Sequence, residues 1–228
     1  MATITTDAAT AVVFDLRPAA RRLARLVEGV HDGWLDAATP CEEFTVRDLL
    51  GHLHGLSAVL SDAAAKRVRT GTAAGAGACV LSGDWRRELP RRIAELADCW
   101  HRHEAWEGAA VVDGTTLPAG VVAQISLGEL VLHGWDLARA TGQAFHCDKP
   151  SLQVVYALLA PEADNPARAP MFAPVVDVPY GSPFLDRVVG LGGRDPGWSP
   201  RACGPKGDEG GEGGEGGEGV PGSEGRTG

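Results

Sequence analysis

Three polar side chains that can do chemistry share one face of an otherwise apolar segment, residues 127–138. Glu129, His133 and Asp136 are surrounded there mainly by leucine, valine, glycine, alanine and tryptophan. At about 100° per residue on a helix, His133 lies roughly 40° from Glu129, and Asp136 lies about 20° to the other side. A carboxylate buried without a partner costs several kcal/mol or must take up a proton. The segment therefore predicts a partner for these three groups.

That partner is either internal or a metal ion. In the internal case, Glu129 and His133 pair across one helical turn, and Asp136 faces solvent or an arginine. In the metal case, the carboxylate and the imidazole bind one ion from the interior of a helix bundle. Catalytic zinc usually has three protein ligands, so a further donor must come from another element. The segment alone leaves both alternatives open.

The remaining histidines are the candidates for the third metal ligand. His52 and His54 lie on the helix predicted after Thr45, and the mean direction of its apolar residues is about 100° from each, on opposite flanks. Helical periodicity therefore does not choose between them. The other histidines are expected on the surface or at turns, where a solvated imidazole is the default: His31, His101, His103 and His146.

Apolar residues at helical spacing indicate the elements that position these groups. Four long helices are expected: one capped by Asp15 and ended by Asp32-Gly33, one opened by a Thr45/Asp48 capping box and reaching Leu60, one from Ser82 or Asp84 to Trp100, and one from Pro118 to about Ala140, closed by Gly142. Pro90 marks a kink or the true start of the third helix. Residues 106–117 are expected to form a loop or small hairpin, 151–159 a fifth helix, and 183–191 a short helix after an irregular proline-rich stretch.

Four long helical patterns with little strand signal predict an all-α fold, a helix bundle, and bundle cores are where such folds place cofactors. We expect a flexible N-terminus at 1–14, one helix-bundle domain at 15–198 and a disordered tail at 199–228. Residues 204–228 hold 12 of the 31 glycines and a net charge of −4. Such a stretch buries too little apolar surface to offset the entropy cost of ordering it.

Composition excludes several classes of protein. Without the tail, the net charge is −5 rather than −9, and the body has no block of lysine or arginine, which argues against a nucleic-acid-binding protein. No apolar run approaches the roughly 18 residues of a membrane span. The first 13 residues hold no basic residue of a secretory signal. The cysteines form no C-x-x-C pair and are expected to be reduced thiols of a cytoplasmic protein: Cys41, Cys79, Cys99, Cys147 and Cys203.

Two ordered motifs give the chain a family resemblance. The first is TPCEEFTVRDLLGH at residues 39–52, and the second is ELVLHGWDLARATG at residues 129–142; the closing stretches 185–187 and 193–196 belong with them. Over about residues 15–198, the chain resembles actinobacterial metal-binding proteins related to mycothiol-dependent maleylpyruvate isomerase. The resemblance implies a DinB/YfiT-like four-helix bundle with an irregular proline-rich C-terminal segment.

The resemblance also implies a set of site residues. Carried over position by position, the family's metal ligands are His52, Glu129 and His133, which favours His52 over His54. Asp136, which follows one helical turn later, is expected to orient a ligand or to accept a proton as a catalytic residue.

The expected function is that of a zinc-dependent thiol transferase or isomerase that uses mycothiol and a small electrophile, with no nucleic-acid or membrane partner. A thiol that coordinates the ion is deprotonated and becomes a nucleophile. The characterised isomerase has an additional C-terminal domain, whereas only residues 144–198 follow the second motif here, so maleylpyruvate is not carried over as the substrate. The alternatives are a non-catalytic metal-binding or regulatory module, and a protein whose Glu129–His133 pair is structural. Two histidines and a glutamate also suit other divalent ions.

Overall fold

The computed structural model describes residues 13–67, 81, 83–165 and 172–200. Its helices and strands are α1 (Arg17–Glu28), α2 (Val46–Ala64), α3 (Trp85–Trp100), β1 (Ala109–Val112), β2 (Thr115–Pro118), α4 (Ala119–Thr141), α5 (Lys149–Leu159) and α6 (Phe184–Leu191), with short 3-10 turns at Asp32–Trp34, His103–Trp106 and Ala160–Glu162. The described part is mostly helical, as predicted. None of its helices is long and apolar enough to cross a membrane. The segments predicted to be flexible or disordered at 1–14 and 199–228 lie almost entirely outside the described residues, as does the glycine-rich stretch 71–78.

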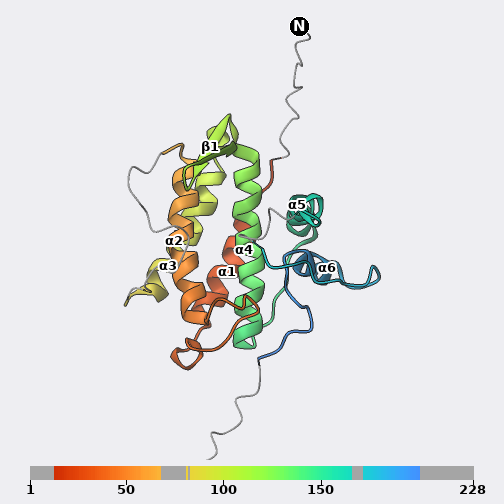
Figure 1. Cartoon of the computed structure of the whole chain (residues 1–228). Coiled ribbons are helices and arrows are strands. Elements are labelled where there is room, and N and C mark those ends of the chain that lie inside the picture. The colour runs from red at the N-terminus through yellow and green to blue at the C-terminus, as the bar shows by residue number, and fades with distance from the viewer. Residues whose placement is uncertain (1–12, 68–80, 82, 166–171, 201–228) are drawn as a thin grey trace, which may run out of the picture.

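Helices α1 to α4 lie side by side around a common core (Figure 1). Both α1 and α2 contact α3 and α4. The facing sides carry apolar residues at helical spacing, and side chains such as Leu23, Leu50 and Leu89 are fully buried between them. Complete burial of one leucine side chain contributes about 1.5–3 kcal/mol. The packing of these faces therefore holds the four helices together.

Helix α4 is buried on most of its circumference because α1, α2 and α5 all pack against it. Its apolar side chains point in nearly every direction, and Leu127, Val131 and Leu137 have no exposed surface. Gly142 ends the helix with a φ of 68°, a left-handed conformation that glycine adopts without steric cost. Polar groups on α4 are consequently taken out of water over most of the helix surface.

A capping box fixes the start of α2, as predicted. The hydroxyl oxygen of Thr45 accepts a hydrogen bond from the N–H of Asp48, and the carboxylate of Asp48 accepts one from the N–H of Thr45. Aspartate takes the place of the usual glutamate in this motif. Because the helix starts at a defined residue, the direction of each side chain in its first two turns, including His52, is set from this end.

One helix start differs from the expectation, and another agrees with it. Helix α1 has its N-cap at Leu16, so Asp15 lies one residue before the cap, although its carboxylate still accepts a hydrogen bond from the N–H of Arg17 at 2.9 Å. Helix α3 begins directly after Asp84, and Pro90 lies inside it. Asp84 is therefore one of the two starts expected for this helix, and Pro90 is not its start.

Strands β1 and β2 pair antiparallel and form a hairpin, one of the two forms expected for this region. Its two turn residues, Asp113 and Gly114, both have positive φ, as a two-residue I′ turn requires. The hairpin lies at one end of the four helices (Figure 1).

The C-terminal helices lie on one side of the four-helix group, α5 against α4 and α6 against α5 (Figure 1). Residues 172–183 hold no helix or strand. After α6, residues 192–198, here called the C-terminal strap, return to α4. The guanidinium of Arg139 on α4 donates hydrogen bonds to the carbonyl oxygens of Pro196 and Trp198. The strap thereby reaches the helix that carries Glu129 and His133.

Candidate metal centre

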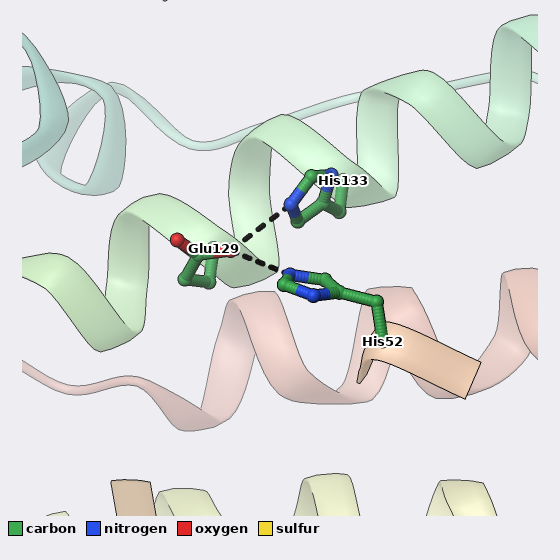
Figure 2. A group of neighbouring side chains, drawn as sticks. All are labelled: His52, Glu129 and His133. Carbon is green, nitrogen blue, oxygen red and sulfur yellow. Dashed lines mark ion pairs between the residues drawn. The ribbon is translucent and has the colours of Figure 1, made fainter. Parts of the chain in front are cut away.

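Helices α4 and α2 bring three of the predicted site residues together (Figure 2). On α4, Nε2 of His133 lies 3.0 Å from Oε2 of Glu129, one helical turn away. From α2, Nε2 of His52 lies 3.5 Å from the same oxygen. The three prospective ligand atoms all lie within 4.8 Å of one another. Side chains from two helices therefore converge on one point.

An aromatic side chain from the loop before α2 covers the imidazoles. The ring centroid of Phe44 lies 5.1 Å from that of His52 and 6.3 Å from that of His133, and the two imidazoles stand 4.9 Å apart. The buried hydroxyl of Thr39 donates a hydrogen bond to the carbonyl oxygen of Phe44 at 2.8 Å, which closes the loop. Phe44 therefore places an aromatic ring beside both imidazoles.

Behind His133 lie Asp136 and Arg194. Oδ2 of Asp136 is 3.0 Å from Nδ1 of His133, the ring nitrogen that faces away from Glu129. The guanidinium of Arg194 donates to both carboxylate oxygens of Asp136, from Nη2 at 2.9 Å and from Nε at 3.3 Å. Asp136 has no exposed surface, and Arg194 is 6% exposed. Of the two surroundings considered for Asp136, the arginine is therefore the one observed, and solvent is not.

The neighbouring charges shift the pKa values of Glu129 and His133 on α4. Burial raises the pKa of Glu129, but the interactions with His133 and His52 lower it by more than burial raises it. The pKa of this carboxyl therefore lies well below its usual range. Burial lowers the pKa of His133, yet Asp136 and Glu129 outweigh that effect and raise the pKa to about 9. Without a metal, His133 is thus protonated at neutral pH. Two carboxylates then face two cations, the imidazolium and the guanidinium of Arg194.

Two neighbouring groups are also shifted. Burial raises the pKa of Asp136, but Arg194 and His133 lower it more, so the carboxyl stays ionised at neutral pH. Burial and nearby carboxylates raise the pKa of the Cys41 thiol to about 11 despite the opposing charge of Arg194. A thiol with this pKa is protonated at neutral pH and is a poor nucleophile.

The donor set and one buried atom fit a divalent metal. Two imidazole nitrogens and a carboxylate oxygen are ligands that zinc favours. Oε2 of Glu129 is buried and accepts no hydrogen bond of good geometry from the described residues, although two imidazoles approach it. Once His133 is neutral, with its Nδ1–H donating a hydrogen bond to Asp136, the lone pair of Nε2 lies on the side of Glu129 and can bind an ion. This carboxylate–histidine arrangement is the one that orients histidine ligands in metal sites.

His54 lies on another side of α2. Its Nε2 is 3.5 Å from Oε2 of Glu88 on α3, and it is not a member of the three-residue group. His52, which the resemblance favoured, is the histidine of α2 that reaches Glu129. The remaining histidines are exposed, as predicted: His31, His101, His103 and His146.

Arg194 is a site residue that the sequence did not identify. It lies 58 positions after Asp136. Residues 193–196 belong to the family resemblance, but the resemblance assigned no function to Arg194. One signal was present, because a carboxylate on an apolar helix needs a counterion. The sequence offers 18 arginines for that purpose, and their spacing does not distinguish one of them.

Comparisons with known proteins agree with the two motifs. Residues 16–138 match the model of the mycothiol maleylpyruvate isomerase N-terminal domain. The chain is 28% identical over 187 residues to two Mycobacterium tuberculosis proteins, uncharacterized protein Rv0738 of strain ATCC 25618 / H37Rv and uncharacterized protein MT0763 of strain CDC 1551 / Oshkosh, covering 75% of this chain and 91% of each relative. No solved structure shows a significant match. The matched family model covers more than half of the chain, including the whole first motif and residues 129–138 of the second, so the chain belongs to the mycothiol maleylpyruvate isomerase N-terminal domain family.

Proposed function

We propose that the protein binds one divalent metal ion, zinc, through His52, Glu129 and His133. The observation that carries this proposal is the convergence of three prospective ligand atoms from two helices around one buried carboxylate oxygen, Oε2 of Glu129. Family membership supports it, because the matched range contains all three residues. Three protein ligands leave a coordination position for a further molecule, as in catalytic zinc sites.

The further molecule in this proposal is a small thiol, mycothiol, and the second substrate is a small electrophile. The description of the family supports the choice of thiol. A bound divalent ion supplies the positive charge that keeps a coordinated thiol deprotonated at neutral pH. The reaction class is then transfer of the thiol sulfur to the electrophile, or an isomerisation assisted by its reversible addition.

The surrounding residues have separate parts in this proposal. Glu129 supplies the anionic ligand, and its charge partly neutralises the ion. Asp136 holds Nδ1 of His133 and so determines which ring nitrogen faces the ion. Both oxygens of Asp136 are engaged by His133 and Arg194. Of the two roles expected for Asp136, we therefore assign it the orientation of a ligand rather than proton acceptance.

The finer features of the fold belong to the same proposal. Helices α1 to α4 would constitute a DinB/YfiT-like bundle within one domain, residues 15–198. The three cysteines of the described part are free thiols, Cys41, Cys99 and Cys147, which supports a reducing compartment such as the cytoplasm.

Metal analysis of the purified full chain tests the ligand set. The wild type is expected to hold stoichiometric zinc, and His133→Ala is expected to lose it because only two protein ligands remain. His103→Ala removes an exposed imidazole on another part of the surface and should keep its zinc. Equal zinc contents in the wild type and His133→Ala would exclude the proposed ligands.

Cobalt substitution tests the thiol. Binding of mycothiol through sulfur should add a thiolate-to-cobalt charge-transfer band to the spectrum of the wild type. A protein that holds its metal but shows no spectral change with mycothiol or other small thiols would be a non-catalytic metal-binding module instead.

A further inference from the structure

We propose that the C-terminal strap is part of the metal centre, because Arg194 is a positioning residue that holds His133, through Asp136, in the orientation needed to bind the ion. This inference rests on the proposed metal site and extends it beyond residues 16–138, the range that the family model matches. It assigns a role in metal binding to a residue that follows the domain-defining helices.

The guanidinium of Arg194 contacts the carboxylate of Asp136 and the backbone of the C-terminal strap. Nη2 and Nε of Arg194 donate to the two oxygens of Asp136, and Nη1 donates to the carbonyl oxygen of Gly192 at 2.6 Å. All three nitrogens are therefore engaged. A fork of this kind fixes both oxygens of a carboxylate, whereas a lysine ammonium acts as a point charge. Arg194 thus fixes the plane of the Asp136 carboxylate.

The second observation is the contact that this carboxylate makes next. With its plane fixed, Oδ2 of Asp136 meets Nδ1 of His133 at 3.0 Å. Holding Nδ1 sets both the ring orientation and the tautomer, which leaves Nε2 as the donor 3.0 Å from Oε2 of Glu129. Without Arg194, a fully buried carboxylate would lose its guanidinium counterion. It would then be expected to turn toward water and release the imidazole.

The third observation is that the backbone itself places Arg194. The N–H of Arg194 donates to the carbonyl oxygen of Val189 in α6 at 3.0 Å. Gly193 has a φ of 81°, and a Cβ there would lie 2.7 Å from the carbonyl oxygen of Ala173, so this position requires glycine. Arg139 of α4 holds the other end of the strap. These backbone contacts therefore fix the position from which the Arg194 side chain reaches Asp136.

Zinc affinity of full-length variants tests the inference. Arg194→Met is expected to weaken zinc binding about 10- to 100-fold, the range typical of residues that orient a metal ligand. Arg187→Met is the matched control: Arg187 also lies in the C-terminal part, 4.7 Å from the ring centroid of Tyr180, and has no contact with the site among those described. Its zinc affinity should equal that of the wild type. Arg194→Lys should recover part of the loss, because it restores the charge but not the fork.

Two further measurements separate positioning from general stabilisation. If Arg194 acts through Asp136, then Arg194→Met should add little to the loss already caused by Asp136→Asn, and the two effects should not be additive. In the zinc-loaded wild type, long-range nitrogen–proton NMR correlations should place the His133 proton on Nδ1.

The outcomes distinguish this inference from the proposed function. A wild type that binds no zinc overturns both. Tight zinc binding by the wild type and by Arg194→Met alike, even with a lower melting temperature for the variant, overturns only the role of Arg194. If Arg194→Met fails to fold, Arg194→Lys and the NMR measurement decide, and a His133 proton on Nε2 in the zinc-loaded wild type overturns the role.

Discussion

Two histidines of α2 each lie at the same distance from a glutamate of another helix, but the two histidine–glutamate pairs have different surroundings. Nε2 of His52 lies 3.5 Å from Oε2 of Glu129 on α4. Two residues along α2, Nε2 of His54 also lies 3.5 Å from a glutamate oxygen, Oε2 of Glu88 on α3. The first pair belongs to a three-residue group that can hold a metal, and the second does not. The pair distance alone therefore does not make a metal centre.

The difference lies in what surrounds each pair. At His52, a third donor, His133, lies next to the carboxylate and is itself held by a buried aspartate–arginine pair. At His54, the neighbouring charge is the cation of Arg92, which would repel a metal ion. The side chain of Glu88 is 38% exposed, against 24% for that of Glu129. The candidate centre therefore differs from the His54–Glu88 pair by a third possible ligand, His133, and by the residues that hold that ligand.

The largest expected effect is the loss of one ligand. His52→Ala should weaken zinc binding by more than the roughly 100-fold typical of supporting residues, because it removes a donor from a set of three. His54→Ala removes an imidazole from the same helix and should leave the affinity unchanged. Competition with a chromophoric chelator measures both. If the two variants lost zinc equally, the distinction between the pairs would be wrong.

The next effect concerns the support of His133. Asp136→Asn keeps the size of the side chain but removes its charge, and it is expected to weaken zinc binding about 10- to 100-fold. Glu88→Gln makes the corresponding change beside His54 and should not alter the affinity. The same chelator competition compares the two variants. An Asp136→Asn protein with wild-type affinity would show that the carboxylate does not act on the ligand.

The pH dependence of zinc binding should follow His133. Asp136 and Glu129 outweigh burial and raise its pKa to about 9 in the metal-free protein, and a proton must leave before the nitrogen can bind the ion. The apparent affinity should therefore rise about tenfold per pH unit from pH 6.5 toward 9 and then level off. In the metal-free protein the same shift has the opposite consequence: the stability it contributes is complete below pH 6.5 and is lost as the pH rises through about 9. Affinity independent of pH over this range would contradict the assignment of His133.

The part of the centre on α4 was predictable from the sequence, and the rest was not, for physical reasons. Glu129 and His133 are one turn apart on a single helix, so helical geometry fixes their relation. The choice between His52 and His54 depends on the rotation of α2 relative to α4, which the packing of the whole core sets; the family resemblance supplied it where periodicity did not. The position of Arg194 depends on the path of the chain through residues 172–183, which hold no helix or strand and therefore show no regular period in the sequence.

The smallest expected effect comes from His54 itself and has the opposite sign to that of His133. Burial, and then the charge of Arg92, lower the pKa of His54 below 6.5 although Glu88 opposes this. As the pH falls, the unfolded chain takes up this proton more readily than the fold does, so stability is lost below pH 6.5. His54→Gln should therefore lose less stability on acidification, with a difference in melting temperature of at most about 4 °C, since partly exposed pairs contribute up to about 1 kcal/mol. Melting curves of the metal-free wild type and His54→Gln on both sides of pH 6.5 measure it. A larger acid sensitivity in the variant would mean that Glu88 stabilises the protonated imidazole, and the two pairs on α2 would then differ less than their surroundings indicate.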